Sequence, residues 1–200
     1  MEKTIVQKSL FKTADMIKIS ILGVISFIIM FIEVPVFFVP GFLKIDASDL
    51  PGLIGAFALG PIAGIFIELI KNLLHLFKTS TGGVGELANF IVGSAFVYSA
   101  GVIYHMKKTK KSAIIGCIFG TIFMSFIAGL CNLYILIPVY SKFMPIEAIV
   151  GMTSEVNSLV VDLNTFILYG IVPFNILKGI LISIATLVLY KYISPVLKKS

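Results

Sequence analysis

The sequence predicts an all-α integral membrane protein of the cell membrane, with six transmembrane helices in a single domain over residues 1–200. The first observation is composition: 58% of the 200 residues are hydrophobic and 13% are charged, whereas a soluble domain carries about 25% charged residues. The second is length, because a span needs about 20 apolar residues and the chain has room for about six spans. The third is the distribution of lysines, which sets the number of crossings.

The chain begins with a polar, basic segment over residues 1–15, which we expect to be a short cytoplasmic tail. The first span follows over residues 16–34. Within it, Ser20, Gly23 and Ser26 recur every three residues, and a stripe of small residues lets another helix approach closely. The stripe predicts either a docking surface for a partner helix or a packing surface inside this chain, and the sequence leaves both open.

The loop after this span organises the rest of the chain. Residues 37–51 read F-F-V-P-G-F-L-K-I-D-A-S-D-L-P and carry Lys44, Asp46 and Asp49. Polar groups between two membrane segments must be hydrated or paired. We therefore expect a polar solute to bind at this charged loop.

The apolar stretch over residues 51–77 is interrupted by Gly60-Pro61. Proline removes a helical hydrogen bond and usually ends or kinks a helix. We therefore expect a short second helix over residues 51–59 and a third helix over residues 61–77. The remaining expected elements are a glycine-rich loop at 78–85, a span at 86–104, a basic loop at 105–111, a span at 112–138, an external excursion with a short helix at 139–166, and a last span at 167–193.

The lysines predict the orientation. The N-terminal tail, the loop 105–111 and the C-terminus are all rich in lysine, and such segments stay in the cytoplasm. An even number of crossings must then separate the tail from the loop 105–111, so the interrupted stretch 51–77 must cross twice. Both termini are cytoplasmic in this scheme, and the loops 35–50, 78–85 and 139–166 lie outside. Because the second helix is too short to span alone, we expect the loop 35–50 to dip into the membrane.

Two pairs of polar residues lie at membrane depth, each three residues apart on one helix face. Polar groups there are unfavourable unless they are paired or functional. Glu68 and Lys71 have opposite charges, which favours a structural ion pair; the alternative is that Glu68 faces a partner subunit. Asn175 and Lys178 lie in a helix without an acid, and Lys178 is too deep to reach the interface easily. We interpret Asn175 and Lys178 as ligand contacts.

Asn132 and Tyr134 lie near the outer end of the neighbouring span, and the same parity places the Asn175 end of the last helix outside. We expect these residues to converge beneath the loop 35–50. A carboxamide offers both a donor and an acceptor, so several carboxamides and one lysine, among many Phe and Leu residues, suit a flat heteroaromatic ligand with an amide-like edge. The acids of the loop suit hydroxyl groups.

The residue inventory argues against an enzyme, a metal site and a nucleic-acid partner. No nucleophile–base arrangement is visible, and His75 and His105 are the only histidines, too few for a histidine-based zinc site. The glycine-rich loop 78–85 lacks the G-K-[ST] ending of a phosphate-binding loop. In a membrane protein, the net charge of +6 reflects topology rather than binding to nucleic acid.

Four motifs carry a resemblance to a known family. They are F-L-K-I-D-A-S-D-L-P at 42–51, G-P-I-A-G at 60–64, E-L-I-K-N-L-L at 68–74 and G-E-L-A-N-F at 85–90. Together they resemble the riboflavin-specific S component of energy-coupling factor (ECF) transporters. The match follows the family in order over almost the whole chain and agrees with its length.

The resemblance implies the six-helix S-component fold and a subunit that binds riboflavin with high affinity, as a transported substrate and not as a cofactor. It also implies ATP-driven uptake through the membrane of a bacterium, with a transmembrane T component and two ATP-binding subunits as partners besides membrane lipid. In this family the first helix usually docks the T component through an alanine-x-x-x-alanine pattern. This chain has no such alanine pair in its first span, and Gly23 and Ser26 stand near those positions at a different spacing. Riboflavin contacts are implied for Asn132, Asn175 and Lys178, with Leu43, Lys44 and Asp46 covering the ligand.

Two other functions stay open at this point. The chain could be a membrane flavoprotein that keeps flavin as a cofactor, or a facilitator that moves flavin without partners. The lack of a haem-type histidine pair and of a cysteine cluster in the sequence favours transport over redox chemistry. No inverted repeat supports the facilitator.

Overall fold

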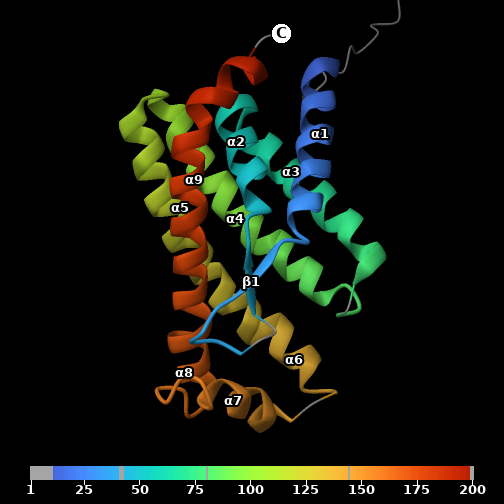
Figure 1. The fold of residues 1–200 in the computed structure, drawn as a ribbon, viewed down its shortest axis with the longest axis vertical. Helices are drawn as coiled ribbons and strands as arrows, with labels where there is room; N and C mark the ends of the chain where they lie inside the picture. The colour runs from blue at the N-terminus through green and yellow to red at the C-terminus, as the bar shows by residue number, and fades with distance from the viewer. Residues whose placement is uncertain (1–10, 41–42, 80, 144, 199–200) are drawn as a thin grey trace, which may run out of the picture.

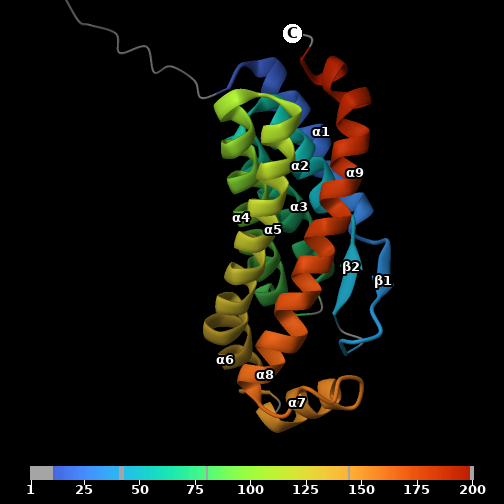
Figure 2. The same cartoon turned by 90° about the vertical axis from the view of Figure 1, so that its left-hand side faces the viewer.

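Most of the long helices run along the long axis of the molecule, one short helix lies across it at one end, and one antiparallel hairpin of two short strands lies beside the bundle (Figures 1 and 2). The computed structural model describes residues 11–40, 43–79, 81–143 and 145–198, so most of the predicted N-terminal tail and Phe42 of the first motif lie outside the described residues. The elements are α1 (Thr13–Ile29), β1 (Glu33–Pro35), β2 (Lys44–Asp46), α2 (Asp49–Leu59), α3 (Pro61–His75), the 3₁₀ turn η1 (Leu76–Lys78), α4 (Val84–Lys107), α5 (Lys110–Cys131), the π-helical segment η2 (Asn132–Leu136), α6 (Ile137–Tyr140), α7 (Ile146–Ser154), α8 (Leu163–Phe166), the π-helical segment η3 (Ile167–Ile171) and α9 (Val172–Lys198).

The prediction of an all-α membrane protein with a short second helix is confirmed. Three continuous helical stretches of the described chain are long and apolar enough to cross a membrane: Val84–Lys107, Lys110–Tyr140 and Leu163–Ile193. α2 has 11 residues and ends at Gly60, whose φ of +118° is a conformation that glycine adopts readily. Pro61 then begins α3. The count of six crossings stays a prediction, because α1 and α3 have only 17 and 15 residues.

The helix ends that adjoin the lysine-rich segments lie together at one end of the molecule. The first turn of α1, the turn between α4 and α5, and the C-terminal end of α9 share this end, and α7 lies at the other (Figures 1 and 2). The turn between α4 and α5 is tight: Lys108 adopts a left-handed conformation, and Thr109 and Ser112 form a capping box at the start of α5. This arrangement is the one that the parity argument requires.

Cysteine labelling of intact cells should therefore distinguish the two ends. Lys142 and Lys108 are both exposed, and the lysine distribution puts Lys142 outside and Lys108 in the cytoplasm. A membrane-impermeant thiol reagent should modify Lys142→Cys and not Lys108→Cys. The native Cys117 and Cys131 are buried and free of disulfides, so they give little background. Labelling of position 108 without position 142 would overturn the orientation.

α2 lies in the middle of the helical bundle. It contacts α1, α3, α4 and α9, and nearly every residue from its start to Phe57 is buried, as expected for a helix that is apolar all round. Leu53 and Phe57 pack into one core cluster with residues of α4, α5 and α9, whereas Ile54 packs into another with α1 and α3. The N-terminus of α2 is thereby held between α3 and α9.

Two features of the backbone were not predicted. The strands β1 and β2 pair with Val34 opposite Ile45, so the loop 35–50 returns to the end of the first helix as a hairpin. The π-helical segments η2 and η3 interrupt the two longest helices and contact each other. Because π-helical turns are frequent at functional sites, their position beside Asn132 and Asn175 is relevant to the site. The short helix expected in the excursion 139–166 is present as α7.

Candidate functional site

Five buried charged residues meet where the N-terminus of α2 lies between α3 and α9. The Lys178 ammonium lies 3.0 Å from Asp49 Oδ2 and 3.3 Å from Asp46 Oδ2. The Lys71 ammonium lies 2.5 Å from Asp49 Oδ1 and 2.5 Å from Glu68 Oε2. Each of the five residues is at most 8% exposed. We call Asp46, Asp49, Glu68, Lys71 and Lys178 the ionic network.

Local geometry explains why the acids gather here. Asp49 is the first residue of α2, where the helix dipole favours a negative charge. Asp46, at the end of β2, accepts a hydrogen bond from the Ser48 backbone N–H at 2.7 Å. The Ser48 hydroxyl accepts one from Lys71 at 3.2 Å, and its carbonyl accepts one from the Ser26 hydroxyl of α1. Ser48 therefore joins the network to α1 and α3.

Glycines make room for the carboxylate of Glu68. A Cβ added at Gly93 of α4 would lie 2.6 Å from Glu68 Oε2, and one added at Gly52 of α2 would collide with Glu68 Oε1. Larger side chains at these two positions would displace the acid from Lys71. The predicted ion pair between Glu68 and Lys71 is confirmed, and the structure adds Asp49 as a second partner of Lys71.

Lys178 has carboxylate partners that the sequence did not reveal. No acid stands in its own helix, but Asp46 and Asp49 arrive from β2 and α2, about 130 positions earlier in the chain. The absence of an acid from its own helix therefore does not leave Lys178 without an acidic partner. The predicted site omitted Asp49. The sequence did contain an indication of its role, because Asp49 follows Asp46 by three residues and stands just before the start of a predicted helix.

The candidate asparagines lie at the two π-helical segments: Asn132 is the first residue of η2, and Asn175 follows the end of η3 by four residues. Asn175 is buried and donates its amide N–H to the Ile171 carbonyl at 2.9 Å. Asn132 is partly buried and donates to the Ala128 carbonyl at 2.9 Å. Asn175 lies one turn before Lys178 on α9, as predicted. Tyr134, in contrast, is 71% exposed, so the structure does not bring it to the network.

The three loop residues predicted to cover the ligand separate in the structure. Asp46 joins the network. Lys44 is exposed and pairs with Glu33 across the hairpin at 2.7 Å, which keeps it away from Lys178. Leu43 packs against an apolar cluster at the end of the molecule that holds α7. This outer cluster consists of Ala128, Ile137, Ile149, Val150, Val160, Phe166 and Ile171.

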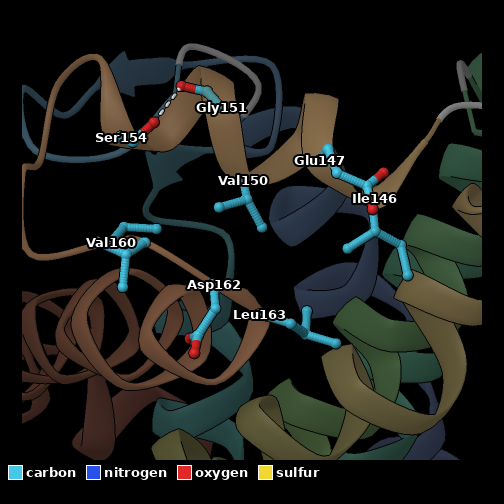
Figure 3. A pocket seen from close by; sticks show the side chains of 9 residues that line it. Ile146, Glu147, Val150, Gly151, Ser154, Val160, Asp162 and Leu163 are labelled. Atoms are coloured by element: carbon cyan, nitrogen blue, oxygen red, sulfur yellow. Dashed lines mark hydrogen bonds between the residues drawn. The ribbon is translucent and has the colours of Figure 1, made fainter.

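A cavity of about 560 Å³ opens beside the outer cluster, between α7 and the start of α8 (Figure 3). Val150 of α7 and Val160 and Leu163 of the facing segment line it, and none of the residues of the ionic network does. Asp162 stands at its edge, where the backbone N–H and the hydroxyl of Thr165 donate to the Asp162 carboxylate. These hydrogen bonds hold the pKa of Asp162 below its ordinary value, so the edge of the cavity carries a negative charge at neutral pH.

The stripe of small residues in α1 is divided between interior and surface. Gly23 and Ser26 are buried, whereas Ser20 is exposed. A Cβ added at Gly23 would lie 2.6 Å from Ile70 Cγ2 of α3, and Ser26 bonds to Ser48. Gly23 and Ser26 therefore serve packing inside this chain, which is the alternative that the sequence left open. Only Ser20 of the three keeps a surface for a partner.

Gly23→Leu should lower the stability of the folded protein. The larger side chain must push α1 away from Ile70, and overpacking of this kind typically lowers the free energy of unfolding by about 1–3 kcal/mol. Thermal unfolding in detergent measures the change, and Ser20→Leu, one turn earlier on the exposed face, is the matched control. If Gly23→Leu unfolds like the parent and loses only uptake, Gly23 docks a partner after all.

Comparison with known proteins agrees with the geometry. Residues 14–190 match the model of the family described as "ECF transporter, substrate-specific component". The riboflavin transporter RibU of Staphylococcus aureus is 39% identical over 184 residues, which cover 92% of this chain and 92% of that protein. The riboflavin transporter FmnP of Bacillus subtilis is 30% identical over 187 residues, which cover 92% of this chain and 94% of that protein.

A solved structure of the S component of a bacterial ECF transporter superposes with a TM-score of 0.72 at 37% identity. The superposition covers 92% of this chain and 98% of the other. The resemblance inferred from the four motifs is confirmed, and so is the S-component fold. The chain therefore belongs to the family of substrate-specific S components of ECF transporters.

Proposed function

We propose that this protein is the riboflavin-binding subunit of an ECF importer. It captures riboflavin at the outer side of the cell membrane and delivers it to a transmembrane T component and two ATP-binding subunits, which drive uptake. The relatives named above as riboflavin transporters support the choice of substrate. The observation that carries the proposal is the pair of Asn175 and Lys178, both buried on one face of α9 beside Asp46 of β2 and Asp49 of α2.

The proposed contacts follow from the chemistry of each side chain. The Asn175 carboxamide can donate to and accept from the pyrimidine edge of the flavin ring. Lys178 then donates from its ammonium group to an electron-rich oxygen or nitrogen of the ring. Asn132, the first residue of η2, supplies a second carboxamide. The outer cluster, with Phe166 and Ile171, offers apolar contact for the ring system.

The loop provides the cover and the polar contacts for the ribityl chain in this proposal. Leu43 already packs on the outer cluster, so it can close over the ring. Asp46 is a hydrogen-bond acceptor for hydroxyl groups. Lys44 would have to leave Glu33 to reach the ligand, and we assign it the weakest contact. Tyr134 would have to turn inward from an exposed position, so we assign it no direct contact.

Riboflavin binding by the purified protein tests the proposal. Protein from cells supplied with riboflavin should be yellow, and the protein freed of flavin should quench the fluorescence of added riboflavin with a stoichiometry of one. The bound molecule should be released unchanged, which distinguishes a transported substrate from the cofactor of a membrane flavoprotein. Thiamine serves as the control vitamin. A protein that neither copurifies with riboflavin nor quenches it would refute the proposal.

Uptake distinguishes a subunit from a stand-alone facilitator. Vesicles that contain this chain alone should bind riboflavin without accumulating it, and vesicles that also contain a T component and the ATP-binding subunits should accumulate it when ATP is present. If riboflavin enters vesicles that contain this chain alone, down its concentration gradient and without ATP, the facilitator would be favoured.

A further inference from the structure

The ionic network has one more acid than it has bases. Asp46, Asp49 and Glu68 face Lys71 and Lys178, so the network would carry a charge of −1 if all five were ionised. None of the five is more than 8% exposed. A buried charge without a counter-ion is strongly unfavourable in a protein and also at membrane depth. The surplus acid therefore calls for one additional cation.

The elements packed around Glu68 supply no such cation among the described residues. α4 faces the Glu68 carboxylate with Gly93 and α2 faces it with Gly52, while α1 reaches the network through the uncharged Ser26. In the described part of the chain, the salt bridges of the five residues join them only to one another. A metal ion is also a poor fit, because the described residues contain no cluster of three metal-ligating side chains.

Glu68 is the carboxylate least able to remain ionised. Asp46 receives the Ser48 N–H and the Lys178 ammonium, and Asp49 has both lysines as partners. Glu68 has only Lys71, and although Oε2 lies 2.5 Å from that ammonium, neither of its oxygens accepts a hydrogen bond of good geometry from the described residues. Two carboxylates against one ammonium also disfavour ionising both, since like charges raise each other's affinity for a proton.

We propose that Glu68 is a proton-binding site, and that the folded protein holds one proton there at neutral pH. The proton makes the network neutral as a whole. Asp46 and Asp49 then stay ionised against Lys71 and Lys178, and Lys178 keeps its ammonium form. The site needs no riboflavin, so its test is independent of the proposed transport function.

Infrared spectroscopy of the unmodified protein tests the site directly. The detergent-solubilised protein at neutral pH should show the carbonyl band of a buried protonated carboxylic acid. The band should shift when the glutamates carry carbon-13 in the side-chain carboxyl group and should stay in place when the aspartates carry it. Because no residue is changed, the result does not depend on a variant that folds. Absence of the band, or a shift with labelled aspartate, would overturn the proposal.

Two variants assign the band to one glutamate. Glu68→Gln should remove it, whereas Glu86→Gln should leave it, since Glu86 is the other buried glutamate of the described chain and accepts hydrogen bonds from Thr79 and Thr81 and contacts His75. A band that disappears in Glu86→Gln and persists in Glu68→Gln contradicts the assignment.

Thermal stability as a function of pH gives a second readout. The folded protein would keep a proton on Glu68 that the unfolded chain releases above the ordinary glutamate pKa of about 4.3. The unfolding temperature of the parent should therefore fall as the pH rises from that value, until Glu68 also ionises in the folded protein. Glu68→Gln mimics the protonated acid and does not titrate, so it should lack this decline and unfold at or above the parent temperature at neutral pH. A large loss of stability in Glu68→Gln at neutral pH would mean that Lys71 needs an ionised Glu68, and the proposal would fail.

Discussion

Lys71→Met should be the most destabilising of the substitutions considered for this chain, with a loss of about 3–5 kcal/mol in the free energy of unfolding, the range for removing one partner of a buried ion pair. Lys71 is fully buried and contacts both Asp49 and Glu68 at 2.5 Å. Methionine fills a similar volume, so the loss reports the charge and not a cavity. Chemical or thermal unfolding in detergent measures the effect.

Lys44 of the hairpin is the matched control for Lys71, because its ion pair is exposed and that of Lys71 is buried. Lys44 pairs with Glu33 at 2.7 Å, but both side chains are more than 40% exposed. Lys44→Met should therefore lower stability by no more than about 1 kcal/mol. The double variant Lys71→Met/Asp49→Asn removes one charge of each sign and should recover part of the loss. Equal losses in Lys71→Met and Lys44→Met would show that the network does not stabilise the fold.

The course of the helices could be predicted because it follows from local signals. Gly60-Pro61 marks the boundary between α2 and α3, since a positive φ followed by proline cannot continue a helix. The spacing of Glu68 and Lys71 is enough to place both side chains on one face of α3. Long apolar stretches identify the spans between α4 and α9 without any tertiary information.

The hairpin and the π-helical segments could not be predicted in the same way. The strands β1 and β2 have three residues each, which is too few for an alternating pattern of polar and apolar residues. They form because the two ends of the loop between them come together and pair. A π-helical segment such as η2 inserts one residue into a helix, which changes the hydrogen-bonding partner without changing composition. Neither event leaves a periodic signal in the sequence.

The partners of Lys178 could not be predicted from sequence periodicity for a related reason. Asp46 and Asp49 become its neighbours only after α2 packs between α3 and α9. The stripe that contains Gly23 shows the same limit, because small residues indicate a close helix approach but do not identify the approaching helix. Here that helix is α3 of the same chain.

Riboflavin binding should weaken roughly ten- to a hundredfold when Lys178 loses its ammonium group. A hydrogen bond from a charged group is worth about 1.5–3 kcal/mol, and each 1.4 kcal/mol is a factor of ten in affinity. Lys178→Met keeps the length and apolar stem of the side chain. It also leaves Asp46 and Asp49 short of one counter-ion, so the single variant combines a loss of binding with a loss of stability.

A charge-balanced variant separates these two effects. Lys178→Met/Asp46→Asn removes one charge of each sign from the ionic network, so it should fold nearly as well as the parent and still bind riboflavin ten- to a hundredfold more weakly. Asp46→Asn alone measures what the acid contributes, and Glu68→Gln, which keeps Lys178 and both aspartates, should bind like the parent. Fluorescence quenching of riboflavin in detergent gives each dissociation constant. If the double variant binds as tightly as Asp46→Asn, Lys178 only balances charge in the network and the proposed pocket is wrong.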